Sequence, residues 1–550
     1  MPAPMPPASP AALSTSDRAR TLDALEREYF DCVVVGGGIT GAGVAREAAL
    51  RGLRVALLEA RDFAAGTSSR SSKLIHGGLR YLAMGDVPLV RDTALERKRV
   101  FALAPHLAER RWMLVPARSY AGLLKFRAGL ATYEKLGAVE QADRHRNWDA
   151  GDLAREEPLL RRDRFPHACV YREYLTDDAR LVLANLRDAV RRGAVALNHV
   201  PVTGIALEAG RAAGVVASCS ASGRSVRVRA RCVVNAAGPW VEAVRRLETP
   251  DAPPWLHLSK GVHVAVPAAR LPLRQIAILG TTDKRSIFAI PRGDVVYLGT
   301  TDTSYGHGAD PEPPVLREDV EYLLEPLPRY FETAPLRPAD CVTAWAGLRP
   351  LIAEAGKHPS ELSRRDEIAR SPSGVVTIAG GKLTGYRKMG VDVLARVAEV
   401  LGRALAPARD EDAPLPGGDF DGDLEALAQH VVRATGVGAR TAARLVRLYG
   451  TEAEPVIARG REPLVADTTV LAGEVDWAID VEGALDALDV VYRRTRAALY
   501  DPDARLAIAL PVAQRMAARL GWSAEQTREQ ARAVRERLAA DLAFREETKP

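Results

Sequence analysis

Residues 31–59 read DCVVVGGGITGAGVAREAALRGLRVALLE, and this stretch decides how the N-terminal part of the chain folds. An apolar run from Cys32 to Val35 leads into the turn Gly36-x-Gly38-x-x-Gly41 and then a stretch of small residues. A second apolar run, Val55 to Leu58, ends on Glu59. Strand, tight turn, helix, second strand and terminal acid together indicate a dinucleotide-binding unit.

Each residue type in this unit has a physical role. Gly36 permits the sharp turn out of the strand, Gly38 lets the backbone approach a pyrophosphate, and Gly41 lets the helix pack close to the sheet. The free N–H groups and the positive dipole end of the helix attract the phosphates. Glu59 stands where a carboxylate accepts hydrogen bonds from ribose hydroxyls, which disfavours NADP and leaves NAD and FAD as alternatives.

The next stretch carries an unusual density of hydroxyls and cations. Residues 67–73 read TSSRSSK and residues 76–81 read HGGLRY. A solvated loop is the ordinary interpretation of a Ser/Thr/Gly-rich stretch, but such loops seldom carry Lys, His, Arg and Tyr at this spacing. The stretch is therefore a candidate part of a binding site.

The GGGITGAG turn (residues 36–43) followed by SSKLIHGGLRYL (residues 71–82) resembles the FAD-dependent, respiratory-type glycerol-3-phosphate dehydrogenases, members of the D-amino-acid-oxidase-like flavoproteins. The resemblance covers residues 29–550 and selects FAD over NAD. It implies an α/β fold with a Rossmann-like FAD-binding domain, an α+β substrate domain on an antiparallel sheet, and an all-α C-terminal domain.

Composition sets the domain expectations. Residues 1–28 are expected to form a disordered tail, because their first 20 residues are rich in Pro, Ala and Ser without a signal-peptide pattern. Residues 29–90, 165–255 and 345–400 are expected to form the FAD-binding domain, and residues 91–164 and 256–344 the substrate domain. A linker at 401–418 precedes an Ala/Arg/Leu/Glu-rich helical domain at 419–550.

Charge and cysteine usage exclude several classes of function. The net charge is +6 with both signs mixed, and no dense basic run or stacking platform indicates nucleic-acid binding. The five cysteines are scattered without a C-x-x-C pair, so neither disulfides nor a metal site is expected. No apolar run is long enough to span a bilayer. The expected location is cytoplasmic, peripheral on the inner face of the membrane.

The resemblance also implies which residues bind the cofactor. Besides the turn and Glu59, they come from the hydroxyl-rich stretch, the strand end near 200, the NAAGPW turn (residues 235–240) and the GGKLTGYR segment (residues 380–387). The full set is Gly36, Gly38, Gly41, Glu59, Thr67, Ser68, Ser69, Ser72, Lys73, His76, Val200, Ala237, Gly238, Gly381, Lys382, Leu383 and Thr384.

The implied reaction converts sn-glycerol 3-phosphate to dihydroxyacetone phosphate, with hydride transfer from C2 to flavin N5. His263, in a Lys-Gly-x-His pattern, is the first choice for the base, because the pKa of an unperturbed imidazole lies near operating pH. Arg349, in AGLRP, would stabilise the developing alkoxide. A phosphate favours the planar fork of arginine. The residues assigned to the substrate are Arg80, Tyr81, Arg349, Arg364 and Lys382, with Arg364 preferred for the phosphate.

Residues 121–137, AGLLKFRAGLATYEKLG, place Leu123, Phe126, Leu130 and Tyr133 on one helical face. A core-facing helix is the more common explanation of such a face. The resemblance favours a helix that dips into an anionic membrane surface, since relatives deliver electrons to membrane quinone.

Several alternatives stay open at the level of sequence. A glycerol-3-phosphate oxidase would share the FAD and substrate sites and use oxygen in place of quinone. A flavin-binding sensor or interaction protein, with its helical C-terminus on a partner, is the alternative from another class. The sequence also leaves open the electron acceptor and whether the chain forms a homo-oligomer.

Overall fold

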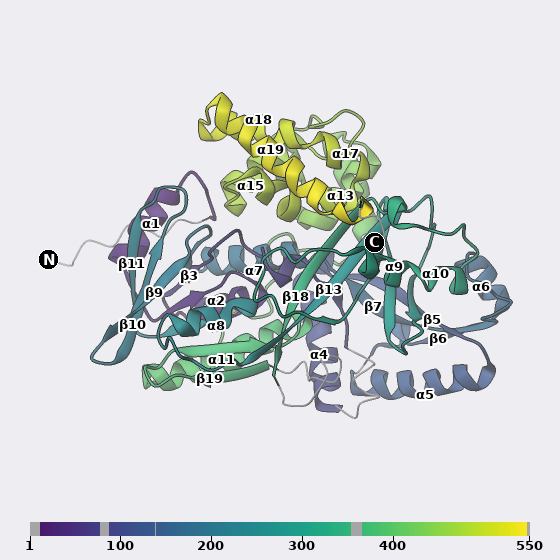
Figure 1. Ribbon diagram of the computed structural model, residues 1–550, viewed down its shortest axis with the longest axis horizontal. Coiled ribbons are helices and arrows are strands. Elements are labelled where there is room, and N and C mark those ends of the chain that lie inside the picture. The colour runs from purple at the N-terminus through teal and green to yellow at the C-terminus, as the bar shows by residue number, and fades with distance from the viewer. Residues whose placement is uncertain (1–11, 78–86, 138, 354–365, 547–550) are drawn as a thin grey trace.

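The computed structural model describes residues 12–77, 87–137, 139–353 and 366–546. Three sheets and a helical domain organise this part of the chain (Figure 1). The C-terminal helices, yellow in Figure 1, gather on one side of the molecule, and α4 and α5 lie on the opposite side. Among the described residues, no helix is both long enough and apolar enough to cross a membrane.

A six-stranded sheet forms the centre of the nucleotide-binding part. Its strands are parallel except at the β19 edge, and its order is β19 (Asp366–Arg370), β20 (Val376–Gly380), β12 (Val233–Asn235), β2 (Cys32–Val35), β3 (Val55–Leu58) and β8 (Val195–Leu197). Helices α2 (Ile39–Leu50), α7 (Asp178–Arg191) and α11 (Tyr386–Leu401) pack on one face.

A small meander covers the other face of this sheet. Its order is β1 (Tyr29–Phe30), β11 (Ser225–Ala230), β10 (Arg211–Ser218) and β9 (Val202–Glu208). Because side chains alternate along a strand, Val34 packs toward the helices, whereas Val33 and Val35 pack toward the meander. Both faces are covered, which explains why β2 is a continuous apolar run.

A ten-stranded, mostly antiparallel sheet forms the second part. It contains β4 (Leu74–Ile75), β5 (Glu109–Ala117), β6 (Arg146–Trp148), β7 (His167–Leu175), β13 (Leu256–Pro267), β14 (Ile276–Gly280), β15 (Ser286–Arg292), β16 (Val295–Gly299), β17 (Thr303–Ser304) and β18 (Thr343–Ile352). Its accompanying helices are α4 (Val87–Leu103), α5 (Tyr120–Leu136), α6 (Ala150–Glu156), α9 (Arg317–Leu324) and α10 (Leu327–Tyr330), and α8 (Val241–Arg246) follows β12.

The C-terminal domain is helical, as the sequence predicts. It consists of α12 (Leu424–Thr435), α13 (Ala439–Tyr449), α14 (Ala453–Ile457), α15 (Ala472–Glu482), the π-helical turn η9 (Asp489–Arg494), α16 (Ala497–Tyr500), α17 (Pro502–Ala507), α18 (Ala509–Leu520) and α19 (Ala524–Ala540). The α/β fold class with three architectures is therefore confirmed.

Two expectations about organisation need correction. The disordered tail expected over residues 1–28 is wrong for α1 (Arg18–Arg27), because Leu22 and Leu25 enter the core beneath the meander and Arg18 donates to Asn198 Oδ1 at 3.1 Å. The N–H group of Thr15 also donates to Ile479 O at 2.9 Å, which ties this segment to the C-terminal domain.

The domain boundaries also differ from expectation. Strands β4, β7 and β18 fall within ranges that the sequence assigned to the FAD-binding domain, yet they pair with strands of the ten-stranded sheet. Pairing with distant strands decides which sheet these three strands join, and local composition does not predict that pairing.

Helix α5 lies where the sequence predicts a helix, with a different division of its faces. Leu123, Leu130 and Tyr133 are buried against the sheet. Phe126, expected on that same face, is 37% exposed. The helix therefore packs on the core and also presents apolar side chains outward.

Candidate active site

A cavity of about 1320 Å³ is lined by residues of both sheets. One end is formed by the loops at the carboxyl edge of the parallel sheet, and the other by side chains of β13, β14, β15 and β18. Pockets for single small ligands measure roughly 300–1000 Å³, so this cavity has room for a dinucleotide and a small substrate together.

The glycine turn has no room for side chains. A Cβ on Gly36, whose φ is +111°, would lie 2.6 Å from Ala236 O, and a Cβ on Gly41 would lie 1.9 Å from Gly36 O. Gly38 lines the cavity, and a Cβ there would meet only Ser68 Oγ, at 3.1 Å. The turn therefore presents bare backbone to the cavity at the N-terminus of α2, as a pyrophosphate requires.

Glu59 ends β3 at the same edge of the sheet. Its Oε2 accepts the N–H of Gly37 at 2.6 Å, and its Oε1 accepts the N–H of Arg61 at 2.9 Å. Burial raises the pKa of this carboxyl group. The two hydrogen bonds from the backbone fix the carboxylate where its remaining lone pairs can accept hydrogen bonds from ribose hydroxyls.

The stretch after Glu59 connects the two ends of the cavity. The Thr67 hydroxyl donates to Leu348 O in β18 at 2.5 Å. Farther along, the N–H of His76 donates to Thr384 Oγ1 at 3.3 Å, and that hydroxyl donates back to His76 O at 3.2 Å. Residues 67–76 are thus tied both to the ten-stranded sheet and to the loop after β20.

Lys73 lines the cavity, and its ammonium group is bound by other groups of the protein. Its Nζ donates to Ser69 O at 2.8 Å and to Asp178 Oδ2 at 3.1 Å, and lies 4.9 Å from the ring centre of Trp345. The side chain is completely buried, and burial lowers its pKa to about 7. This charge supports the architecture of the site.

His263 points into the cavity from β13 between two strand neighbours. It is paired with Gly299 on β16 and with Trp345 on β18. A Cβ on Gly299 would lie 2.0 Å from the imidazole, and the Trp345 ring stacks on it at 5.1 Å and 8°. Burial, and then the charges of Lys73 and Arg349, hold the pKa of His263 well below its usual value.

The two ring nitrogens of His263 differ in their surroundings. Nε2 lies 2.9 Å from the hydroxyl oxygen of Ser72. Nδ1 is buried and has no hydrogen-bond partner within the described ranges. The carbonyl of Ser72 is held in turn by the hydroxyl of Tyr297, at 3.0 Å. The imidazole is therefore neutral, oriented and available as a proton acceptor.

Arg349 occupies the same sheet face, since β18 residues 345, 347 and 349 alternate with Ala344, Ala346 and Leu348, which are buried on the other face of the strand. It donates to Asp302 Oδ1 at 3.1 Å and to Thr300 Oγ1 at 2.9 Å. A Cβ on Gly261 would lie 2.3 Å from its guanidinium, so this glycine on β13 makes room for it. The guanidinium is held by an acid and a hydroxyl at the edge of the cavity.

Comparison with known proteins gives this geometry a family. Residues 31–387 match the FAD dependent oxidoreductase family, and residues 408–527 match the C-terminal domain of alpha-glycerophosphate oxidase. The aerobic glycerol-3-phosphate dehydrogenase of Staphylococcus haemolyticus is 39% identical over 456 residues, 80% of this chain and 82% of that protein. Its counterpart in Bacillus subtilis is 36% identical over 504 residues, 89% and 91% of the two chains. The chain belongs to the FAD-dependent glycerol-3-phosphate dehydrogenase family.

A solved structure agrees with this membership. The glycerol-3-phosphate dehydrogenase from Bacillus halodurans, complexed with FAD, matches 98% of this chain and 100% of its own, with a TM-score of 0.81 and 32% identity. FAD is the cofactor, and the bare glycine turn with its neighbouring carboxylate fits the diphosphate and ribose of that group.

For this glycerol-3-phosphate dehydrogenase family member, the cavity collects most of the residues predicted to bind cofactor or substrate. Those that line it are Gly36, Gly38, Glu59, Thr67, Ser68, Ser72, Lys73, His76, Ala237, Gly238, His263, Arg349, Gly381, Lys382, Leu383 and Thr384. Gly41, Ser69 and Val200 do not line it. Gly41 packs against Gly36 of the turn, and Ser69 is buried, with its carbonyl bound to Lys73. Val202 lines the cavity in place of Val200. Arg80, Tyr81 and Arg364 lie outside the described residues.

Sequence reasoning missed other cations of the cavity. Arg70, Lys284 and Arg285 line it as well. Arg285 donates to the backbone carbonyl of Asp302 at 3.1 Å, and the carboxylate of the same residue pairs with Arg349. The segment 283–286, DKRS, carried the available signal, since two adjacent cations precede an apolar strand.

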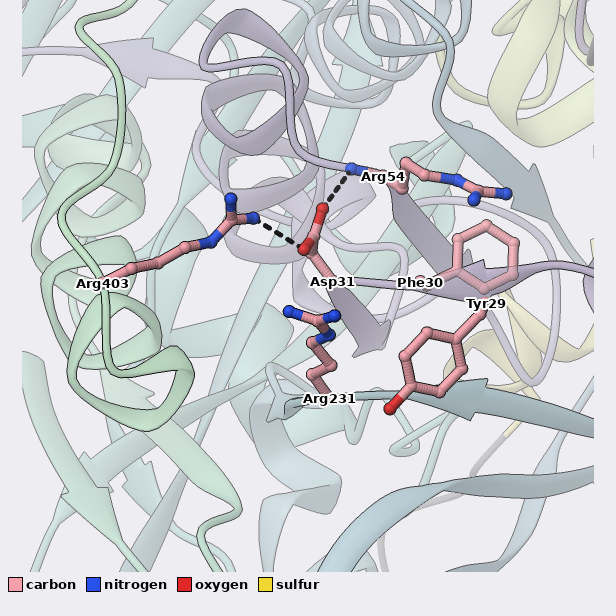
Figure 2. A pocket seen from close by; sticks show the side chains of 6 residues that line it. All are labelled: Tyr29, Phe30, Asp31, Arg54, Arg231 and Arg403. Atoms are coloured by element: carbon pink, nitrogen blue, oxygen red, sulfur yellow. Dashed lines mark hydrogen bonds and ion pairs between the residues drawn. The ribbon is translucent and has the colours of Figure 1, made fainter.

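A smaller pocket of about 230 Å³ lies at the amino edge of the parallel sheet (Figure 2). Arg54, Arg231 and Arg403 surround Asp31 there. Asp31 accepts the backbone N–H of Arg54 at 3.0 Å and the guanidinium of Arg403 at 2.8 Å. This family's nucleotide site uses the opposite, carboxyl edge, so the smaller pocket is a surface ion-pair cluster.

Proposed function

We propose that this protein oxidises sn-glycerol 3-phosphate to dihydroxyacetone phosphate and passes the electrons to a membrane quinone. One observation carries the proposal. A neutral, oriented His263 and a held Arg349 share one sheet face, which opens into the cavity that contains the dinucleotide turn. The names of the relatives at 36–39% identity support the same substrate.

The protein supplies proton removal and charge stabilisation. His263 accepts the proton of the C2 hydroxyl, because its depressed pKa keeps the imidazole neutral at operating pH. Arg349 stabilises negative charge as it develops on the C2 oxygen. Bound FAD would supply the hydride acceptor for C2. Ser72 and Trp345 hold the imidazole in its orientation throughout.

Cations at the substrate end favour a phosphorylated substrate. Lys284, Arg285 and Arg349 line this end of the cavity, and Lys382 lines the cavity from the loop after β20. A phosphate dianion is bound by such converging donors, and best by the planar fork of arginine. Arg80, Tyr81 and Arg364 stay predictions for substrate binding, with Arg364 as the predicted phosphate ligand.

An apolar side of the cavity supports a lipophilic electron acceptor. Met113, Val115, Phe126, Ile278 and Phe288 line this side. A quinone ring, which is flat and largely apolar, suits such a lining.

Helix α5 is the candidate membrane contact. It exposes 61% of Tyr120, 43% of Leu124 and 37% of Phe126. Lys125 and Arg127 lie among them and would face anionic headgroups. Because Phe126 also lines the cavity, the same helix would place the cavity at the lipid surface. A peripheral location on the membrane follows from this proposal.

The oxidase remains the second candidate, because residues 408–527 match a domain named for alpha-glycerophosphate oxidase. Substrate specificity and acceptor are tested separately. Anaerobic addition of glycerol 3-phosphate to the purified holoenzyme should bleach the flavin absorbance, and glycerol without phosphate should not. Failure to bleach would favour a flavin-binding sensor. In air, stoichiometric peroxide would establish the oxidase, whereas reduction of a short-chain quinone without peroxide would establish the dehydrogenase.

A further inference from the structure

The segment of residues 67–73, termed here the active-site loop, holds Ser72 against His263 and is itself anchored from below. Its anchor is Asp178, the first residue of α7. Asp178 Oδ2 accepts the Ser71 N–H at 3.0 Å, the Ser71 hydroxyl at 2.7 Å and Lys73 Nζ at 3.1 Å. One completely buried carboxylate thus fixes both neighbours of Ser72.

The other oxygen of Asp178 is bound from a different domain. Arg496, between η9 and α16 of the C-terminal domain, donates to Asp178 Oδ1 at 2.9 Å and to Asp177 Oδ2 at 3.1 Å. The same guanidinium reaches Ser69 O in the active-site loop, at 3.4 Å. A single side chain therefore contacts the loop directly and also fixes the carboxylate that anchors it.

The backbone of Arg496 indicates that this reach is specified. Arg496 has a φ of +60°, a left-handed conformation that is unfavourable for a non-glycine residue. Its side chain is 1% exposed, and its remaining donor is satisfied by Tyr492 O at 2.7 Å. The C-terminal domain thus commits a buried cation and an uncommon backbone conformation to this one contact.

We propose that Arg496 is a positioning residue for the active site, holding the active-site loop through Asp178 so that Ser72 stays against His263. The helical domain then contributes to the chemistry without touching substrate or cofactor. Its docking would be a condition for an oriented base, which explains how a domain on the far side of α7 matters to turnover. This inference rests on the proposed function only for its kinetic test.

The chain offers a matched control. Arg187 on α7 also reaches the C-terminal domain, pairing with Glu452 Oε1 and Oε2 at 2.7 Å each, and its side chain is 4% exposed. It is similarly buried and also holds two carboxylate oxygens, but among the described residues it makes no hydrogen bond or ion pair with the active-site loop. Arg187→Ala therefore removes an interdomain ion pair without removing the loop anchor.

The first measurement is hydrogen–deuterium exchange of the full-length holoenzyme, followed on peptides that span residues 67–76. Arg496→Ala should accelerate exchange there about tenfold or more, as expected for the loss of charged hydrogen bonds. Arg187→Ala should leave these peptides at wild-type rates. Arg496→Lys keeps the charge but cannot bridge both aspartates, so its exchange should lie between the two.

The second measurement is steady-state turnover. Misplacing the base should lower kcat about ten- to a hundredfold in Arg496→Ala, with little change in KM, since no substrate contact is removed. Arg187→Ala should keep kcat, and Arg496→Lys should recover part of it. If Arg496→Ala does not yield folded holoenzyme, Arg496→Gln, which is neutral but similar in length, replaces it in both measurements.

If the active-site loop of Arg496→Ala, or of Arg496→Gln where it replaces that variant, exchanges at the wild-type rate, the positioning role is overturned. Equal effects of Arg187→Ala would overturn it too, because they would show that domain docking alone is responsible. If the wild-type protein fails to oxidise glycerol 3-phosphate, the proposed function falls while the exchange result still decides the role of Arg496.

Discussion

The hydroxyl oxygen of Ser72 lies 2.9 Å from Nε2 of His263, across 191 residues of chain. One partner follows the nucleotide-binding unit, and the other belongs to the ten-stranded sheet. The contact therefore joins the cofactor end of the cavity to the residue proposed to accept the proton. It orients the imidazole and leaves Nδ1 as the nitrogen with no partner in the described part of the chain.

Replacing His263 should affect turnover far more than binding. His263→Ala should lower kcat by about 10²–10⁴, the usual contribution of a general base. Ser72→Ala, which removes only the orienting hydroxyl, should lower kcat by a smaller factor at unchanged flavin content. Stopped-flow flavin reduction under anaerobic conditions measures the chemical step directly. Wild-type reduction rates in His263→Ala would assign the base to another group.

The pH dependence of turnover should reflect a histidine that resists protonation. Burial, and then the charges of Lys73 and Arg349, hold the pKa of His263 well below 6.5. The acid limb of the kcat profile should therefore lie at a pH below 6.5. Lys73→Met removes one of those charges, so the pKa of His263 should rise and the acid limb should move toward pH 6.5. The profile of kcat is measured at saturating substrate to exclude ionisation of the free substrate. Identical limbs in both proteins would contradict this origin of the shift.

A methyl group at residue 261 should disturb Arg349 without touching the fold. In Gly261→Ala, the new Cβ would lie 2.3 Å from the guanidinium, so the arginine must leave Asp302. We expect kcat/KM to fall by the equivalent of about 2–4 kcal/mol in transition-state stabilisation, as for a lost charge-paired contact. Gly204→Ala on β9 is the control, since its Cβ would meet only Val216, at 3.9 Å. Equal kinetics of the two variants would show that Arg349 has no role in turnover.

The stability of the fold should decline in mild acid because of His106. Burial, and then the charges of Arg180 and Arg187, lower the pKa of His106 to about 3. The unfolded chain binds a proton near pH 6.5 and the folded chain does not, so this stability is complete above pH 6.5 and is lost as pH falls toward 3. The loss amounts to roughly 1.4 kcal/mol per pH unit.

The His106 contribution can be isolated by difference. The free energy of unfolding of the wild type minus that of His106→Asn should become smaller as the pH is lowered from 6.5 to 4, as measured by urea denaturation. A flat difference for His106→Asn would mean that its imidazole is protonated in the folded state.

Membrane binding should depend on the outward face of α5. Replacing Tyr120, Leu124 and Phe126 together by Ser removes the apolar side chains that this helix exposes. Cosedimentation with phosphatidylglycerol-containing vesicles should then drop strongly, at a wild-type melting temperature. Leu506→Ser is the control, because Leu506 is 74% exposed but belongs to the C-terminal domain. Unchanged cosedimentation of the triple variant would remove α5 as the membrane contact.

Local sequence was sufficient for the nucleotide unit and for the fold class. Gly36 is required by its positive φ of +111° and Gly41 by its contact with the Gly36 carbonyl, and the apolar run of β2 reflects a strand buried on both faces. The Ala/Arg/Leu/Glu-rich composition of residues 419–550 likewise indicated the helical C-terminal domain. These features depend on short-range sterics and on the alternation of side chains, which a sequence displays directly.

Motif resemblance nominated His263 and Arg349, but it did not contain their environment. Lys73 was predicted to bind cofactor, whereas its ammonium is held by Asp178 and Ser69. The cations Arg70, Lys284 and Arg285 reach the cavity only because distant strands pair.

The sequence by itself determined the dinucleotide turn, the succession of architectures and the residues nominated for catalysis. Only the tertiary structure decided that Ser72 meets His263, that β4, β7 and β18 belong to the ten-stranded sheet, and that Arg496 reaches the active-site loop. The physical reason is chain separation. Turns and strand faces are set by neighbours along the chain, whereas these contacts form between segments that fold together only when the whole core is buried.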